Sequence, residues 1–94
     1  MTVLGIDPGP NESAYVLWDG LAIIEHGNTP NQDLLAALED PVRSFNIIPP
    51  EHCAIEQICG FGIMASDGLF DTCFYSGRFL QAFGEKRTTM IPRK

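Results

Sequence analysis

Two short apolar runs of this sequence each end in a carboxylate, and this pattern constrains the fold more than any other feature. Asp7 closes the run Val3-Leu4-Gly5-Ile6, and Glu56 follows Cys53-Ala54-Ile55. A buried carboxylate costs several kcal/mol unless it is protonated, hydrogen-bonded or bound to a cation. Two carboxylates at the ends of core-like strands therefore predict a divalent metal between them. The alternative is that each residue only caps its strand where the strand reaches solvent.

The length and composition of the chain are those of a small globular domain. Its 94 residues suffice for one hydrophobic core, near the lower end of the sizes that fold alone. Hydrophobic residues make up 45% of the chain, and no apolar run approaches the roughly 20 residues that a membrane helix needs. No membrane partner is therefore expected. The N-terminal Met1-Thr2-Val3-Leu4 has no basic leader, so we expect a cytoplasmic protein.

The three cysteines are odd in number and contain no C-x-x-C pair. A secreted domain of this size usually carries more cysteines, in even number, so we expect Cys53, Cys59 and Cys73 to be reduced thiols in the core. His52 with Cys53 and Cys59 lacks a fourth ligand at suitable spacing. No zinc site is therefore expected.

The net charge of −6 is unevenly distributed along the chain. Residues 1–85 hold all 12 acidic side chains and only two basic ones, while the other four basic side chains lie in the last nine residues. This basic patch predicts contacts with phosphate groups, although a solubilising tail explains it equally well and four charges cannot provide high affinity alone. The patch consists of Lys86, Arg87, Arg93 and Lys94.

Turn signals and apolar periodicity predict five strands and two helices. Strands are expected at about residues 2–7, 13–18, 21–25, 52–58 and 88–91. The first helix is expected from Asn31 until Pro41 ends it, and the second from about Ser66 until Gly84. No repeat or linker divides this order.

Three local details carry specific expectations. Asp19-Gly20 suits a tight two-residue turn with positive φ at both positions, which predicts an antiparallel hairpin. Asn31 is expected to cap the first helix. In the second helix, residues at three- and four-residue spacing predict the core face, and Gly77 predicts a close approach to the sheet. That predicted face consists of Leu69, Phe70, Cys73, Phe74, Gly77 and Leu80.

Right-handed crossovers place the fourth and fifth strands on the other side of the first strand from the hairpin. The expected fold class is therefore α/β, with a mixed five-stranded sheet of order 3-2-1-4-5, an antiparallel strand 2 and helices packed on the sheet. Strand order reverses between strands 1 and 4, where ligand sites of open α/β sheets commonly lie. Asp7 and Glu56 end these two strands, so we expect them to be neighbours. Alternation places Glu56 with Ala54, facing away from Ile55.

The residues around the two carboxylates form a pair of motifs. The first is Val3-Leu4-Gly5-Ile6-Asp7-Pro8-Gly9-Pro10 followed by Ser13-Ala14-Tyr15, and the second is Ala54-Ile55-Glu56-Gln57. Together they resemble the RuvC family of Holliday-junction resolvases, particularly its phage-type relatives. Actin-like ATPases also begin with a strand-Asp-x-Gly turn, but the paired motifs are more specific. The resemblance covers essentially the whole chain and implies an RNase H-like fold.

The resemblance also implies an activity, namely hydrolysis of phosphodiester bonds in branched DNA with Mg²⁺ or Mn²⁺ as the cofactor. Asp7 and Glu56 match the first two acidic positions of the family's metal site. Gly9 and Phe61 are expected to approach the DNA, together with the basic patch. Family resolvases act as dimers on a two-fold symmetric substrate, so a homodimer without a nucleotide cofactor is expected.

The chain departs from the family after the fifth strand. Family members place further carboxylates on a following helix, whereas this chain ends at Lys94. We therefore expect a single RNase H-like domain, residues 1–94, that is incomplete at its C-terminus, binds metal weakly and cleaves DNA poorly or not at all. One alternative is a non-catalytic DNA-binding or protein-interaction module with the same fold. Another, an actin-like nucleotide-binding fragment, leaves Glu56 unexplained.

Overall fold

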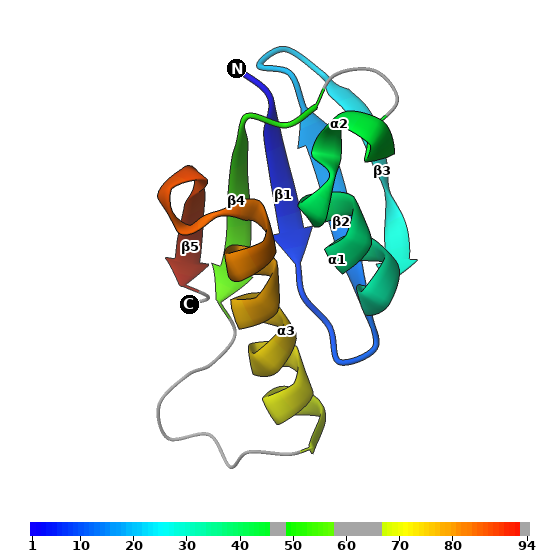
Figure 1. Cartoon of the computed structure of the whole chain (residues 1–94), viewed down its shortest axis with the longest axis vertical. Helices are drawn as coiled ribbons and strands as arrows, with labels where there is room; N and C mark the ends of the chain where they lie inside the picture. The colour runs from blue at the N-terminus through cyan, green and yellow to red at the C-terminus, as the bar shows by residue number, and fades with distance from the viewer. Residues whose placement is uncertain (46–48, 58–66, 93–94) are drawn as a thin grey trace.

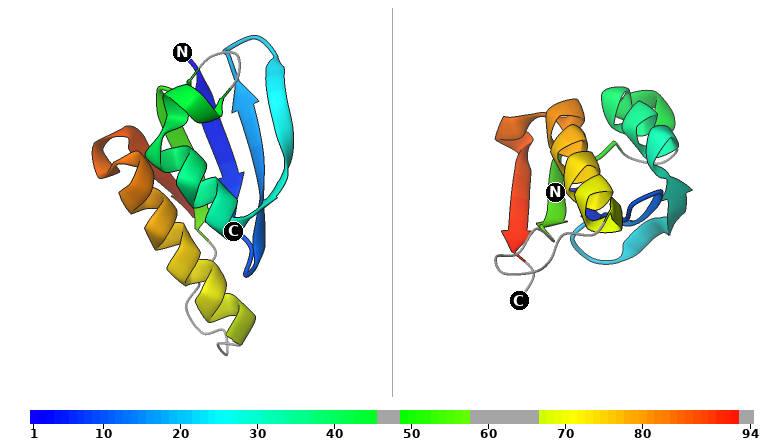
Figure 2. Two further views of the ribbon diagram at one scale, coloured as in Figure 1. Left: turned by 45° about the vertical axis from the view of Figure 1, so that its right-hand side comes forward. Right: turned by 90° about the horizontal axis from the view of Figure 1, so that it is seen from below.

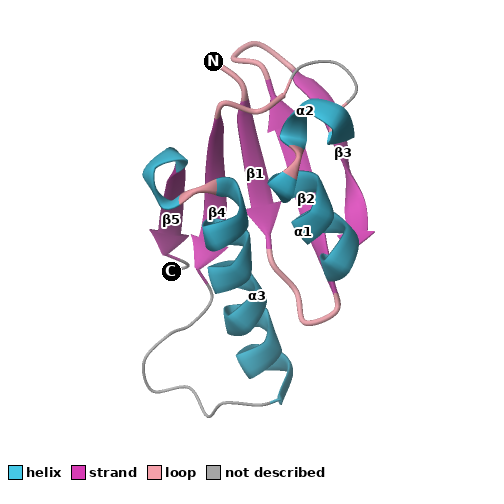
Figure 3. Ribbon diagram, in the orientation of Figure 1, coloured by secondary structure: helices cyan, strands magenta, loops and turns pink. Residues whose placement is uncertain are grey.

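The computed structural model describes residues 1–45, 49–57 and 67–92, in which five strands form one sheet with helices packed against it (Figure 1). The strands are β1 (Val3–Asp7), β2 (Glu12–Trp18), β3 (Ile23–Pro30), β4 (His52–Gln57) and β5 (Thr88–Pro92). The helices are α1 (Asn31–Glu39), α2 (Pro41–Ser44), α3 (Asp67–Phe83) and the short 3₁₀ helix η1 (Glu85–Arg87). Figure 3 shows their succession along the chain. Within the described residues, no helix is long and apolar enough to cross a membrane.

The sheet has the order β3-β2-β1-β4-β5, which confirms the expected fold class. The central strand β1 pairs antiparallel with β2 and parallel with β4, and β5 continues the parallel half beyond β4. A parallel pair requires a long crossover connection. The chain makes these crossovers through α1 and α2 before β4, and through α3 before β5.

The hydrophobic core lies between one face of the sheet and the helices α1 and α3 (Figure 2). Because side chains alternate along a strand, β1 and β4 each send every second residue into this core. The opposite face carries no helix among the described residues. We call it the open face, and its central residues are Gly5, Asp7, Ala54 and Glu56. The buried core consists of Leu4, Ile6, Leu17, Leu34, Leu35, Leu38, Phe45, Cys53, Ile55, Phe79 and Phe83.

The β2–β3 hairpin closes differently from the expectation. Four residues, 19–22, connect the strands, and among the described residues only glycines have positive φ, so the two-residue turn is wrong. The Asp19 carboxylate accepts hydrogen bonds from the backbone N–H groups of Ala22 (2.9 Å) and Leu21 (2.8 Å), which hold the pKa of this carboxyl below its ordinary value. A side-chain acceptor thus organises the turn.

Asn31 is the first residue of α1 and does not cap it, contrary to the expectation. Pro30 occupies the cap position, and no side-chain hydrogen bond caps the helix. The Asn31 side chain is buried and bonds instead to Ser13 and Gly9. The helix does end before Pro41, as expected, and this proline opens α2, where its missing N–H costs nothing.

The exposed face of α3 contains residues that the periodicity assigned to the core. Phe70 and Phe74 are 64% and 60% exposed. A Cβ added at Gly77 would meet no atom within 4 Å, so this glycine does not serve a close approach to the sheet. The predicted core face is therefore wrong at these three positions, whereas Leu80 does pack against the core.

The buried face of α3 is half polar. It consists of Thr72, Ser76, Phe79 and Phe83, which follow one another at three- and four-residue spacing. The Thr72 hydroxyl donates to the carbonyl of Gly68 (2.8 Å), and the Ser76 hydroxyl donates to the carbonyl of Thr72 (2.9 Å). These bonds satisfy the hydroxyls inside the helix, which permits their burial. An apolar pattern cannot identify a face of this composition.

The cysteines also differ from the expectation. Cys53 is a free, buried thiol, as expected, but Cys73 is disulfide-bonded, so the prediction of three reduced thiols is wrong. Cys59 lies outside the described residues. Burial raises the pKa of the Cys53 thiol from 9.0 to about 12.

The different burial of two phenylalanines in α3 predicts different effects of their replacement on the free energy of unfolding. Phe79→Ala removes a fully buried ring and should lower the free energy of unfolding by about 3 to 5 kcal/mol, whereas Phe70→Ala should change it by less than about 1 kcal/mol. Urea unfolding of dilute protein measures both values. Equal losses would mean that the predicted apolar stripe faces the core after all.

The raised pKa of Cys53 predicts an inert thiol. At pH 8 the folded protein keeps this thiol protonated, because its pKa lies near 12, and a disulfide reagent should modify it only at the rate of unfolding. The same reagent in urea should react at once. Rapid modification of the folded protein at Cys53, located by peptide mass mapping, would contradict its burial.

Candidate functional site

The two carboxylates singled out in the sequence lie at the same edge of the sheet. Asp7 is the last residue of β1, and Glu56 lies one residue before the end of β4. These strands are parallel neighbours in which Gly5 pairs with Ala54. Asp7 and Glu56 each follow one member of this pair by two positions, so both lie on the open face.

Both carboxylates line one pocket on the open face, with a volume of about 380 Å³. Small residues of the three central strands leave room for it, and β5 supplies a further wall. The lining consists of Gly5, Ile6, Asp7, Ala14, Tyr15, Val16, Ala54, Glu56, Ile91 and Pro92. The β5 residues were not identified from the sequence, because the strand order makes β5 a neighbour of β4 but does not set the register that pairs Ile91 with Glu56.

The two carboxylates of the pocket differ in how far they are buried. Asp7 is exposed and Glu56 is half-buried, so the position of Asp7 matches the alternative in which the residue ends its strand where the strand reaches solvent. The cause is the open face, where no helix of the described residues shields the end of β1 from solvent. Convergence of two carboxylates on one pocket, rather than their desolvation, is therefore the argument for a cation.

The donor set fits one hydrated divalent cation. Carboxylate oxygens are the hard ligands that Mg²⁺ prefers, and Mg²⁺ is usually held by one or two carboxylates with water and phosphate in the remaining positions. Among the described residues, no group of three or more His, Cys, Asp or Glu side chains is placed to hold a metal. The described part of the chain thus offers ligands for one ion and does not itself form a two-ion site.

Two buried polar side chains hold the turn after Asp7 by hydrogen bonds to its backbone. The Gly9 N–H donates to Ser13 Oγ (3.2 Å), and Asn31 Nδ2 donates to the Gly9 carbonyl oxygen (2.9 Å). A Cβ at Gly9 would collide with the carbonyl oxygen of Glu12, so the close packing of this turn requires glycine. Gly9 was expected at the site from the sequence, whereas Ser13 was placed only in a family motif and Asn31 only at a helix cap, without a role at this turn. The available signal was a serine at a core-facing position of β2.

The basic patch divides into a described and an undescribed part. Lys86 and Arg87 precede β5, whose direction matches that of β1 and β4, so they lie at the opposite edge of the sheet from the carboxylates. Arg87 Nη2 donates to the carbonyl of Phe83 (3.1 Å), and its guanidinium lies 4.4 Å from the centre of that ring. The Arg87 side chain therefore caps the C-terminal end of α3. Phe61, Arg93 and Lys94 lie outside the described residues.

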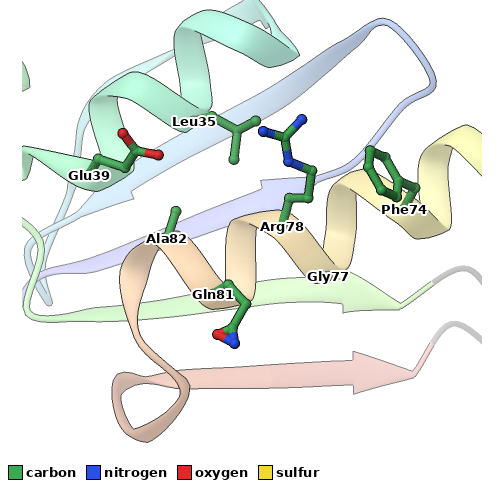
Figure 4. Close-up of a pocket in the computed structure, with 7 residues that line it drawn as sticks. All are labelled: Leu35, Glu39, Phe74, Gly77, Arg78, Gln81 and Ala82. Atoms are coloured by element: carbon green, nitrogen blue, oxygen red, sulfur yellow. The ribbon is translucent and has the colours of Figure 1, made fainter.

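A larger cavity of about 730 Å³ lies between α1 and α3 (Figure 4). Figure 4 shows Arg78 of α3 and Glu39 of α1 beside it, with Phe74 at one end. Its lining contains a single carboxylate, so it lacks the paired oxygen donors that divalent-metal chemistry needs. We therefore place the candidate site in the pocket of Asp7 and Glu56.

Comparison with known proteins gives a structural likeness only. No protein-family model matches the chain, and no curated protein matches it. Two solved structures of Thermus thermophilus RuvC are similar to 99% of the chain at 16% sequence identity. RuvC in complex with a Holliday junction substrate gives a TM-score of 0.69, and a further RuvC structure gives 0.64.

The chain spans 64% and 63% of the length of these two RuvC chains, which is less than two thirds. The chain has a RuvC-like fold.

Proposed function

We propose that this chain is a Mg²⁺-dependent, structure-specific endonuclease domain that acts on branched DNA, with Asp7 and Glu56 as its metal ligands. The observation that carries the proposal is the convergence of these two carboxylates on one pocket, where the strand order of a RuvC-like fold reverses. One RuvC structure with this fold is a complex with a Holliday junction substrate. Mn²⁺ should substitute for Mg²⁺ because it takes similar oxygen ligands.

The residues of the pocket have separate roles in this proposal. A divalent cation held by Asp7 and Glu56 would supply Lewis-acid polarisation of the scissile phosphodiester. The Asp7 and Glu56 carboxylates would bind this cation in the pocket, and the small residues Gly5 and Ala54 leave room for a phosphate beside the cation. The turn at Gly9, directly after Asp7, is the backbone that we expect the DNA strand to approach.

The described residues place two carboxylates at the pocket, and this small number of ligands limits the activity that we expect. A two-ion clamp on an in-line displacement needs more oxygen ligands than these residues provide. We therefore propose weak metal binding and low or absent cleavage by the 94 residues alone. The alternative is a module that binds DNA or another protein through the same fold without cleaving DNA.

Cleavage of a synthetic four-way junction tests the proposal. Any Mg²⁺- or Mn²⁺-dependent cleavage by the 94-residue chain should favour the junction over a linear duplex and fall by about two orders of magnitude in Asp7→Asn and in Glu56→Gln, because each removes a charged ligand. Asp19→Asn is the matched control, since Asp19 lies in the hairpin turn at the other end of the sheet.

Three results separate the alternatives. Cleavage that survives both substitutions would contradict the assigned ligands. Junction binding without cleavage, by folded protein whose Mn²⁺ affinity does not change in Asp7→Asn or Glu56→Gln, would favour the non-catalytic module. Binding of neither junction nor duplex would contradict both DNA-directed readings.

We further propose a homodimer formed through the exposed face of α3. Phe70 and Phe74 are one helical turn apart and mostly exposed, and Arg78 lies over the Phe74 ring with its guanidinium 5.5 Å from the ring centre. Aromatic residues and arginine are enriched in protein interfaces. A two-fold pairing of this face would match a two-fold symmetric substrate.

Sedimentation velocity tests the dimer. Phe74→Asp places a charge on the proposed interface and should convert a dimer into a monomer, whereas Leu21→Asp, at a 94% exposed residue in the hairpin turn, should leave the dimer intact. A wild-type chain that stays monomeric at high concentration would contradict the proposed dimer. A dimer that resists Phe74→Asp would place the interface elsewhere.

A further inference from the structure

We propose that Ser13 and Asn31 are positioning residues, which lock the turn after Asp7 and thereby fix the direction in which the Asp7 carboxylate enters the pocket. Neither side chain lines the pocket itself. The inference rests on the proposed function in one respect, because the site that they position is the proposed metal site of Asp7 and Glu56.

The two side chains form a closed ring of hydrogen bonds with one glycine. The Gly9 N–H donates to Ser13 Oγ (3.2 Å), the Ser13 hydroxyl donates to Asn31 Oδ1 (2.6 Å), and Asn31 Nδ2 donates back to the Gly9 carbonyl oxygen (2.9 Å). Both polar groups of the Gly9 backbone are therefore held. The direction of each bond also determines which way the Asn31 amide points.

The ring of hydrogen bonds is buried, so water cannot replace its bonds if the turn moves. Ser13 and Asn31 are each 1% exposed. A buried amide or hydroxyl without partners costs free energy, and among the described residues no buried side-chain nitrogen or oxygen lacks a hydrogen bond. Any shift of the turn would leave at least one of these groups unsatisfied, so the turn has one strongly preferred position.

The turn depends on these bonds because it has few of its own. Residues 8–11 are Pro8-Gly9-Pro10-Asn11, and the two prolines carry no N–H. The Gly9 N–H is bound by Ser13, and the Asn11 carbonyl accepts the backbone N–H of Asn31 (2.9 Å). The first residue of α1 thus holds both halves of the turn.

Asp7 lies where the sheet stops supporting β1. It pairs with Ala14 at the last position of the β1–β2 ladder, and no pairing to β4 extends beyond Ile6. The chain then enters the turn at once. The backbone at Asp7 is therefore held on one side by its pairing with Ala14, and on the other side it continues into the turn that Ser13 and Asn31 hold.

The opposite end of β1 offers a matched control. Thr2 is also buried, and its hydroxyl donates to the Pro49 carbonyl (3.0 Å) and accepts the Glu51 N–H (3.1 Å). It therefore ties the same strand to the rest of the fold through a similar set of bonds. It lies at the edge of the sheet away from Asp7, so its loss should affect stability but not the pocket.

The test compares the two ends of β1 in the 94-residue protein. Ser13→Ala and Thr2→Val each remove one buried hydroxyl, and Asn31→Ala is the more disruptive second variant at the ring. Mn²⁺ affinity is measured by electron paramagnetic resonance titration, and melting temperature by circular dichroism. Ser13→Ala should weaken Mn²⁺ binding about tenfold, as is typical of residues that orient a metal ligand, while Thr2→Val should lower the melting temperature without changing the affinity more than about twofold.

A second readout does not depend on metal. Three-bond NMR couplings of Asp7 report its χ1 rotamer, which should be single in the wild type and averaged in Ser13→Ala but not in Thr2→Val. If the wild type binds no Mn²⁺, the proposed metal site fails and the couplings alone decide the positioning role. An unchanged Asp7 rotamer in folded Ser13→Ala, or equal loss of Mn²⁺ affinity in Ser13→Ala and Thr2→Val, would overturn the inference.

Discussion

The parallel pairing of β1 with β4 is the constraint on which the rest of the structure depends. Because the strands run in the same direction, their carboxyl ends meet at one edge, and the pairing of Gly5 with Ala54 sets the register. The same register directs Leu4 and Ile55 into the core and Asp7 and Glu56 to the open face. A shift by one residue would exchange the two faces, so core packing and the site are specified together.

The strand order was predictable because its signals are local and its connections obey a handedness rule. The details that failed depend on contacts between distant residues. Asn31 was expected to cap a helix, as its residue type favours, but it bonds to Ser13, 18 positions earlier. The buried face of α3 was misassigned because Thr72 and Ser76 are polar by composition yet satisfied within the helix.

The two carboxylates of the candidate site were predictable from the sequence, but the β5 residues of the pocket and the burial of the carboxylates were not. Two carboxylates at the ends of apolar runs indicated Asp7 and Glu56 directly. The sequence left open whether Asp7 is buried or lies at the solvent boundary, because the open face is a property of the whole sheet and not of either run. The distance of Lys86 and Arg87 from the pocket likewise follows only from the direction of β5. The clustering of basic residues near the end of the sequence therefore did not predict that Lys86 and Arg87 lie far from the pocket.

The proposed activity depends on Asp7 and Glu56 binding one cation together. Mn²⁺ titration of the wild type, Asp7→Asn, Glu56→Gln and the double variant measures this coupling directly. We expect each single substitution to remove most of the Mn²⁺ affinity and the second substitution to add less than its separate effect, because both carboxylates bind one ion. Independent, additive effects, or an affinity that neither substitution changes, would contradict a shared cation.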